Sequence, residues 1–325
     1  MDTIGHILPV LLCGGAGTLL WPLLGERTLL QAAAEHSSDI GAAAPLIVCS
    51  EGLRFMVESQ LARIGLTPGA LLVEPHGRGT APALTAAAVH ALAADDPVLL
   101  ALPSDHLVTR PQAFLRALRR GAALARRGYI VAFGAPAVAP ETAYGYLRAG
   151  LPILAPSGPG DPDAHFVEAF VEKPDAATAR SYVESRQYRW DAGILAVRAS
   201  VWIDAVGCYN RAMLAACERA YRNAEREPRT REQAAETLSS VRLRLHAPSF
   251  SQCPSDSIDC AILERIAQDA SFPAAVVSLD AGWADAATRH RYAGEHPHAA
   301  AGASTAAGGA PGRGEAARRS AAGSP

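Results

Sequence analysis

Short apolar runs alternate with segments of helical spacing through the N-terminal part of the chain. The runs are Ile7–Cys13, Pro45–Ser50, Ala70–Val73, Pro97–Leu102 and Tyr129–Gly134. Continuous apolar runs of this length are typical of strands that are buried on both faces. The segments between them, such as Leu53–Ile64 and Pro111–Arg127, repeat apolar residues at helical intervals. This alternation predicts an α/β fold, with a Rossmann-like mixed, mostly parallel sheet and helices on both faces.

The C-terminal half is less regular. Strands are expected at Glu141–Leu147, His165–Lys173, Trp190–Arg198 and Ala274–Leu279, and helices at Asp204–Arg226 and Asp259–Gln268. From about His290 the chain turns to Ala, Gly, Ser, Pro and Arg without periodicity, which is typical of disordered segments. We therefore predict a folded domain over residues 1–288 and a low-complexity, disordered tail over residues 289–325.

The first apolar run leads directly into a glycine-rich stretch, Leu11–Pro22. Gly14, Gly15 and Gly17 carry no Cβ, so backbone N–H groups there can approach phosphate oxygens. By itself the pattern also fits a plain tight turn, because it lacks the third glycine of the dinucleotide fingerprint and the lysine of a P-loop. Its place is informative, since ligands of such sheets bind at the carboxyl ends of strands. A second polar motif, Ser104–His106, follows the fourth apolar run.

Charge and cysteine content bear on the functional class. The formal net charge is −2, so nothing favours nucleic acid or an anionic membrane as a partner. Residues 7–25 are uncharged, but Asp2, Pro9 and Pro22 argue against a signal peptide or membrane span, and we expect a cytoplasmic protein. The six cysteines have no zinc-binding spacing and are expected to be reduced thiols. Lys173 is the only lysine among 30 basic residues.

Eight motifs of this chain are similar to the motifs of a known protein family. The stretch GGAGTLLWPL is similar to G-G-x-G-T-R-L-W-P-L, and FVEKPD is the same string in both. The others are VEPHGRGTAPA, LPSDHLV, FGAPAVAPETAYGYLRAG, YRWDAGILAVRAS, PSDSIDCAILER and LDAGWADAAT. In this order they resemble the mannose-1-phosphate guanylyltransferase (GDP-mannose pyrophosphorylase) family of sugar-phosphate nucleotidyltransferases. Eight ordered matches over roughly 280 residues make a specific signal.

The resemblance implies the fold of nucleotide-diphospho-sugar transferases and the synthesis of GDP-mannose. In that reaction an oxygen of mannose-1-phosphate attacks the α-phosphorus of GTP, and pyrophosphate leaves. The attacking oxygen is already anionic, so catalysis depends on alignment and charge neutralisation. Such chemistry needs Mg²⁺, carboxylates to hold it and cations around the triphosphate. GTP and mannose-1-phosphate are thus the implied partners, and a homo-oligomer is left open.

The resemblance also implies roles for individual residues. The metal ligands are Asp105 and Asp285, and the catalytic residues are Asp105 and Lys173. The nucleotide-binding residues are Gly14, Gly15, Gly17, Thr18, Glu74, Arg78, Thr80 and Ala81. The residues around the sugar phosphate are Gly145, Glu172, Lys173 and Asp191.

Each of these roles has a plainer alternative. Without the resemblance, Asp105 reads as a helix or turn cap, Asp285 as a solvated loop residue and Lys173 as an ordinary surface lysine. Asp280 competes with Asp285 for the metal. Thr80 is also expected to cap the helix that follows it.

Several positions depart from the family's motifs. The family's arginine after Gly-x-Gly-Thr is Leu19 here, and the lysine of its Pro-Lys-Gln-Phe is Leu30. Asp191 and Gly79 each stand where the family has Asn. A lost charge-assisted contact in a transition state typically costs about 3–4 kcal/mol. Two functions remain: an impaired guanylyltransferase, or a non-catalytic paralogue that binds nucleotide or sugar phosphate as a partner or regulatory protein. The isomerase activity of longer family members is not expected, because the chain leaves no room for its domain.

Overall fold

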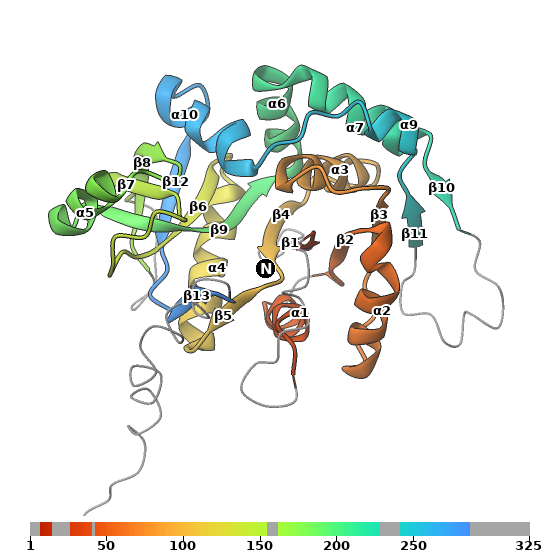
Figure 1. Cartoon of the computed structure of the whole chain (residues 1–325), viewed down its shortest axis with the longest axis horizontal. Coiled ribbons are helices and arrows are strands. Elements are labelled where there is room, and N and C mark those ends of the chain that lie inside the picture. The colour runs from red at the N-terminus through yellow and green to blue at the C-terminus, as the bar shows by residue number, and fades with distance from the viewer. Residues whose placement is uncertain (1–6, 15–26, 41–42, 155–161, 228–240, 287–325) are drawn as a thin grey trace, which may run out of the picture. The chain divides into compact units, whose positions relative to one another are not determined.

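The fold is built on a long mixed sheet. The computed structural model describes residues 7–14, 27–40, 43–154, 162–227 and 241–286. In these residues eleven strands follow the order β10-β11-β3-β2-β1-β4-β9-β6-β12-β8-β7 (Figure 1). The strands are β1 (Ile7–Cys13), β2 (Leu46–Ser50), β3 (Ala70–Glu74), β4 (Val98–Pro103), β6 (Ile130–Pro136), β7 (Tyr146–Pro152), β8 (Ala164–Val171), β9 (Tyr188–Arg198), β10 (Glu225–Arg226), β11 (Val241–Arg244) and β12 (Ala274–Ser278). Pairing is parallel from β11 to β4, and β9 and β8 pair antiparallel with their neighbours. The predicted mixed, mostly parallel sheet is confirmed.

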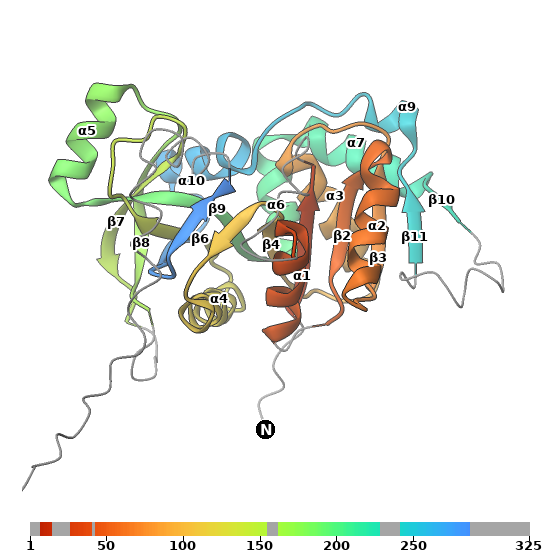
Figure 2. The same ribbon diagram turned by 60° about the horizontal axis from the view of Figure 1, so that its bottom comes forward.

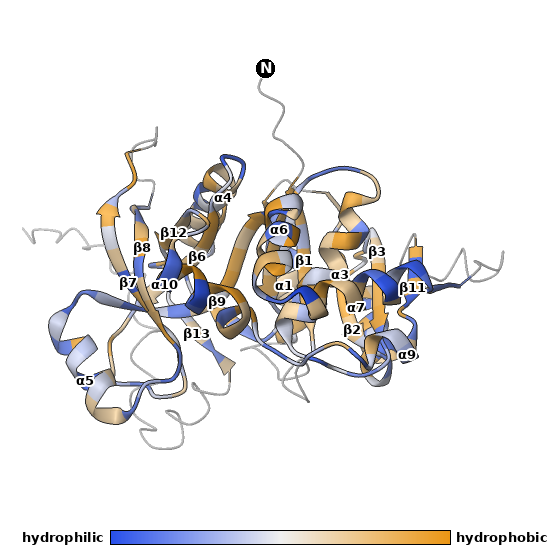
Figure 3. Cartoon of the chain, turned by 90° about the horizontal axis from the view of Figure 1, so that it is seen from above, coloured by the Kyte–Doolittle hydropathy of each residue, from blue (hydrophilic) through white to orange (hydrophobic). Residues whose placement is uncertain are grey.

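Helices cover both faces of this sheet. One face carries α1 (Leu29–Asp39), α2 (Arg54–Arg63) and α4 (Pro111–Ala125), and the other carries α3 (Thr80–Leu92), α6 (Ala199–Tyr209) and α7 (Arg211–Arg222) (Figure 2). Alternate residues of the strands enter the two cores, as the two-residue period of a strand requires. Leu11 and Ile47 pack with the first set of helices, whereas Val10 and Val48 pack with the second. Hydrophobic residues concentrate accordingly on the central strands (Figure 3).

The sheet turns back on itself at its C-terminal end. β7 pairs with β8 along one edge and with β9 along the other, so β9, β6, β12, β8 and β7 form a closed ring of strands. A separate two-stranded sheet joins β5 (His106–Val108) to β13 (Trp283–Asp285). These long-range pairings bring the segment before β7 and the segments after β4 and β8 toward the start of β9. None of the helices in the described ranges has the length and hydrophobicity that a membrane crossing requires.

The predicted elements need four corrections. The helix expected over Asp204–Arg226 is two helices, because Asn210 ends α6 and its side chain accepts a hydrogen bond from the backbone N–H of Met213 to cap α7. The strand expected over Glu141–Leu147 begins only at β7. The helix expected over Asp259–Gln268 opens with a π-helical turn, η3 (Asp259–Leu263), before α10 (Glu264–Asp269).

The fourth correction is α1, for which no helix was predicted. Thr28 and Gln31 form a reciprocal capping box at its start, and this spacing is a recognisable sequence signal for a helix. The short strands β5, β10, β11 and β13 were also not predicted. Nor were the remaining helices, α5 (Ala176–Ser185) and α9 (Ala247–Phe250). The predicted tail lies outside the described residues, so the predicted domain boundary stays a prediction.

Candidate active site

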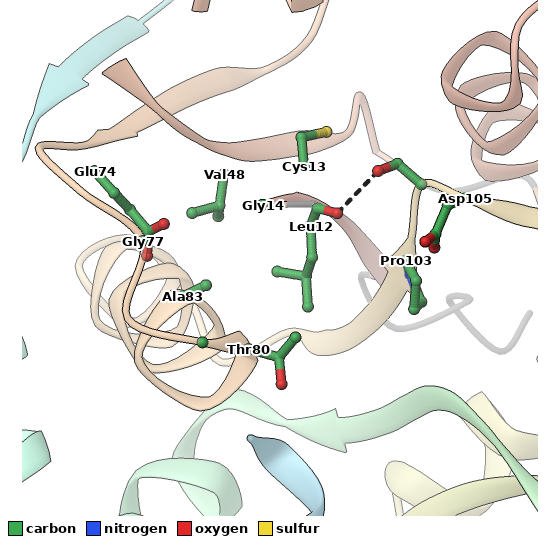
Figure 4. A pocket seen from close by; sticks show the side chains of 12 residues that line it. Leu12, Cys13, Gly14, Val48, Glu74, Gly77, Thr80, Ala83, Pro103 and Asp105 are labelled. Carbon is green, nitrogen blue, oxygen red and sulfur yellow. Dashed lines mark hydrogen bonds between the residues drawn. The ribbon is translucent and has the colours of Figure 1, made fainter. Parts of the chain in front are cut away.

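A hollow of about 330 Å³ lies at the carboxyl ends of β1, β3 and β4. Gly14 follows β1, Glu74 ends β3, Ser104 and Asp105 follow β4, and Thr80 begins α3; all five line this nucleotide-side hollow (Figure 4). The Ser104 hydroxyl donates a 3.0 Å hydrogen bond to the carbonyl oxygen of Leu12, which fixes the end of β4 against β1. The hollow is where the sequence predicted it to be, at the edge where parallel strands end.

Glu74 is the most deeply buried acid of this hollow. Its side chain lines the cavity, only 3% of the residue is exposed, and Oε1 has no hydrogen-bond partner among the described residues. Burial raises the pKa of Glu74 to about 8. The group is therefore mostly a neutral carboxylic acid at pH 7, with one oxygen that offers a hydrogen-bonding site to a ligand.

The start of α3 differs from the prediction. Gly79, not Thr80, is the N-cap residue, with φ 94°, and the Thr80 hydroxyl accepts a 3.0 Å hydrogen bond from the backbone of Ile258. The backbone of Asp256 donates to the carbonyl of Arg78 at 3.0 Å. A Cβ at Gly79 would lie 2.2 Å from the carbonyl oxygen of Asp256. Glycine is therefore required here, and the family's Asn would not fit this arrangement.

The structure brings only some of the predicted nucleotide-binding residues together. Gly14, Glu74 and Thr80 line the hollow. Arg78 instead donates through its guanidinium to the carbonyl of Ser251, at 2.7 Å, and Ala81 is buried beneath the helix start. Gly15, Gly17, Thr18 and Leu19 lie outside the described residues. Ser104, from the second polar motif, also lines the hollow, as do Gly77 and Val48, which were not singled out from the sequence.

A second hollow, of about 180 Å³, lies at the mouth of the strand ring. All four residues predicted to surround the sugar phosphate line it: Gly145, Glu172, Lys173 and Asp191. The Lys173 ammonium lies 2.8 Å from a Glu172 carboxylate oxygen, and this hydrogen bond raises the pKa of the lysine. Lys173 also has φ 43°, a left-handed conformation that costs a non-glycine residue energy and often occurs at functional sites. We call this cavity the sugar-side hollow.

Gly145 and Asp191 are tied together in the wall of the sugar-side hollow. The backbone N–H of Asp191 donates a 2.8 Å hydrogen bond to the carbonyl of Gly145. A Cβ at Gly145 would lie 2.9 Å from Oε2 of Glu172, so the absence of a side chain there lets the Glu172 carboxylate approach. Asp259, which the sequence did not single out although it lies within the PSDSIDCAILER motif, also lines this hollow.

Asp105 and Asp285 lie where the two hollows adjoin. β5 and β13 are antiparallel, Asp285 is opposite His106, and the N–H of Ala286 donates to the carbonyl of Asp105 at 3.1 Å. Asp105 lines the nucleotide-side hollow and Asp285 the sugar-side hollow. Burial lowers the pKa of His106 against the opposing influence of both carboxylates, so the imidazole is neutral at pH 7. Asp280 instead pairs with Arg110 at the surface and lines neither hollow.

The carboxylate pair suits one kind of metal. Mg²⁺ is typically held by one or two carboxylates, with water and substrate phosphate oxygens completing its shell. In the described ranges no group of three or more His, Cys, Asp or Glu side chains forms a complete protein cage for a metal. Asp105 and Asp285 therefore fit Mg²⁺ bound together with phosphate and do not fit a closed structural site.

Cationic groups are unevenly distributed over the two hollows. Lys173 lines the sugar-side hollow, whereas the described residues that line the nucleotide-side hollow include neither Lys nor Arg. Leu30, at the position of the family's lysine, is fully buried in the core beneath α1. Arg27 forms an ion pair with Glu35 on α1. The nucleotide side therefore relies on backbone groups and neutral side chains in the part of the chain that the structure describes.

Comparisons with known proteins bear on the family and the fold. A sequence profile of the nucleotidyl transferase family matches residues 8–288. The xanthan biosynthesis protein XanB of Xanthomonas campestris is 40% identical over 87% of this chain, and the mannose-1-phosphate guanylyltransferase of Salmonella muenchen is 35% identical over 87%. The chain spans 58% of the length of each. Among solved structures, one described as mannose-6-phosphate isomerase from Helicobacter pylori superposes with a TM-score of 0.72 at 25% identity, covering 86% of this chain and all of that one.

Proposed function

Because the chain belongs to the nucleotidyl transferase family, we propose that it transfers GMP from GTP to mannose-1-phosphate, with release of pyrophosphate, to form GDP-mannose. One observation carries the proposal: the pairing of β5 with β13 links a hollow at the ends of β1, β3 and β4, lined by Asp105, to a hollow with a lysine, lined by Asp285. The names of the Salmonella and Xanthomonas relatives support the choice of substrate and a role in polysaccharide synthesis.

The residues divide the work of the reaction between them. Glu74, Thr80 and Gly14 face the nucleotide, and Lys173 and Asp191 face the sugar phosphate. Asp105 and Asp285 would hold Mg²⁺, which when bound neutralises charge on the phosphates. The phosphate oxygen of the sugar needs no base, so these groups act by holding two anionic substrates in line.

A second candidate, a binding protein without turnover, is favoured by the nucleotide-side hollow. Leu30 is buried where the family has a lysine, and Leu19 replaces the family's arginine. Each missing cation would cost about 3–4 kcal/mol of transition-state stabilisation, or 10²–10³ in rate. We therefore infer that transfer, where it occurs, is slow relative to a family member with both cations.

The test measures pyrophosphate release and binding on the same preparation. The full chain is incubated with Mg²⁺, GTP and mannose-1-phosphate, beside a family member that carries the arginine and lysine, and the binding of each substrate is measured by calorimetry. Slow release that is abolished in Asp105→Asn supports the transferase. Binding of either substrate without release supports the second candidate, and neither release nor binding refutes both.

A rescue variant sharpens this test. Leu19→Arg adds a cation in the glycine-rich stretch and should raise the rate of pyrophosphate release. Leu30→Lys was expected from the sequence to help as well, but it would bury an ammonium group in the core. A rate that stays unchanged in Leu19→Arg would mean that the missing arginine is not what limits turnover.

A further inference from the structure

Two buried carboxyl groups lie against each other in the wall of the sugar-side hollow. Asp191 comes from β9 and Asp259 begins η3, and both line the same hollow of about 180 Å³. Only 7% of Asp191 is exposed, and its Oδ1 has no hydrogen-bond partner among the described residues although the residue lines the hollow. Two carboxylates buried in one small hollow repel each other when both are ionised, which favours one proton held between them.

The surroundings of the pair favour keeping that proton. Burial, together with the nearby Glu172 carboxylate, raises the pKa of Asp191 well above its usual range and that of Asp259 to about 6. In the opposite direction, the backbone N–H of Gly193 lowers the pKa of Asp191, and the Lys173 ammonium lowers the pKa of Asp259. Lys173 is already engaged by Glu172 at 2.8 Å.

Lys173 is the only lysine or arginine among the described residues that line the sugar-side hollow. His106 on β5, Asp285 on β13 and the uncharged Tyr144 and Trp283 also face it. The Lys173 ammonium favours the ionised form of Asp259, which leaves the shared proton on Asp191.

A protonated aspartic acid has nearly the shape and hydrogen-bonding pattern of asparagine, the residue that the family's motif has at position 191. Its O–H takes the place of the amide N–H₂ as donor to Asp259. Its remaining oxygen, Oδ1, is then an uncharged carbonyl that accepts a hydrogen bond, as an amide oxygen does.

We propose that Asp259 is a positioning residue that keeps Asp191 in its neutral acid form, so that Oδ1 of Asp191 accepts a hydrogen bond from a hydroxyl of the bound sugar phosphate. This inference rests on the proposed function for the identity of the ligand. With one proton on the pair, the hollow also presents one negative charge fewer to the anionic phosphate of the ligand. Loss of the proton both adds that charge and separates the two carboxylates.

The experiment measures the affinity of the full chain for mannose-1-phosphate by calorimetry from pH 5.5 to 9. Asp191→Asn keeps the shape and cannot ionise, and Asp204→Asn, on the exposed side of α6, is the matched control. We expect wild type and Asp204→Asn to lose about tenfold in affinity per pH unit once the pair ionises. Asp191→Asn should keep its affinity over the same range and should match wild type at low pH. Equal pH profiles for wild type and Asp191→Asn would overturn the inference.

Infrared spectroscopy separates this inference from the proposed function. Wild type at pH 7 should show the C=O band of a neutral buried carboxylic acid that titrates with the pair and is missing in Asp191→Asn. Absence of that band in wild type overturns the inference whatever the ligand. If the band is present but neither protein binds mannose-1-phosphate at any pH, then the assigned substrate is wrong, and with it the role of Oδ1 toward a sugar hydroxyl.

Discussion

Glu74 should make the stability of this protein depend on pH in a way that one substitution removes. The carboxyl is 3% exposed in the nucleotide-side hollow, and burial raises its pKa from 4.5 to about 8. Between these two values the native state holds a proton that the unfolded chain has released. The contribution of Glu74 to stability is therefore fully present below pH 4.5 and is lost as the pH rises toward 8, by about 1.4 kcal/mol per pH unit. Over the whole interval the loss is about 5 kcal/mol at most.

Glu74→Gln has the same size and no titrating proton. Its amide adds an N–H₂ group to a site with one unpartnered oxygen, which shifts stability by a constant of about 1–3 kcal/mol but leaves no dependence on pH. The free energy of unfolding should therefore change between pH 4.5 and 8 by several kcal/mol less in Glu74→Gln than in wild type. The diagnostic quantity is this difference in slope, because the constant offset cancels.

The measurement is urea denaturation at closely spaced pH values from 4.5 to 8.5. Glu184→Gln, on the exposed surface of α5, is the matched control and should follow wild type throughout. Parallel curves for wild type and Glu74→Gln would refute the reasoning, because they would mean that Glu74 titrates in the native state as it does in the unfolded chain.

Three further predictions follow from the site. Asp105→Asn should lower Mg²⁺-dependent pyrophosphate release about 10²–10³-fold, whereas Asp280→Asn, at the surface, should leave the rate unchanged; equal losses would argue against the metal assignment. Gly79→Ala should lower the free energy of unfolding by at least about 1–3 kcal/mol, because of left-handed strain and the close approach of the 255–258 segment. Gly77→Ala is the control: its added Cβ meets open space, so it should change the free energy of unfolding little in the same urea titration. Leu30→Lys should cost about 3–5 kcal/mol, because it buries an unpaired ammonium; near-wild-type stability would mean that the side chain reaches solvent or a ligand.

Local patterns in the sequence were enough for most of the fold. The apolar runs that became β1, β2, β3, β4 and β6 were recognisable because each strand is buried on both faces, and burial selects for continuous hydrophobic residues. The helix over α2 and that over α4 followed from the 3.6-residue repeat. The prediction failed where the signal was short or mixed, as at Asn210, where one polar cap residue divides a long helical pattern.

The candidate site was predicted unevenly, for a physical reason. The resemblance assigned Gly14, Asp105 and Lys173 to the site, and each lines one of the two hollows because it follows a strand that ends there. The sequence could not place Asp259 beside Asp191, since these distant residues meet only in the lining of the folded sugar-side hollow. It also assigned Arg78 to the ligand, whereas the fold directs that side chain to a backbone carbonyl.

By itself, then, the amino-acid sequence determined most of the central strands, several of the helices and which family's motifs they carry. The periodicity of buried residues and the spacing of motifs are properties of neighbours along the chain. Only the tertiary structure decided that the site is divided into two adjoining hollows, that β7 closes a ring with β9, and that Leu30 is core. These three features depend on pairings between distant segments. The free energy that stabilises such pairings comes from burying surfaces that meet only in the folded chain.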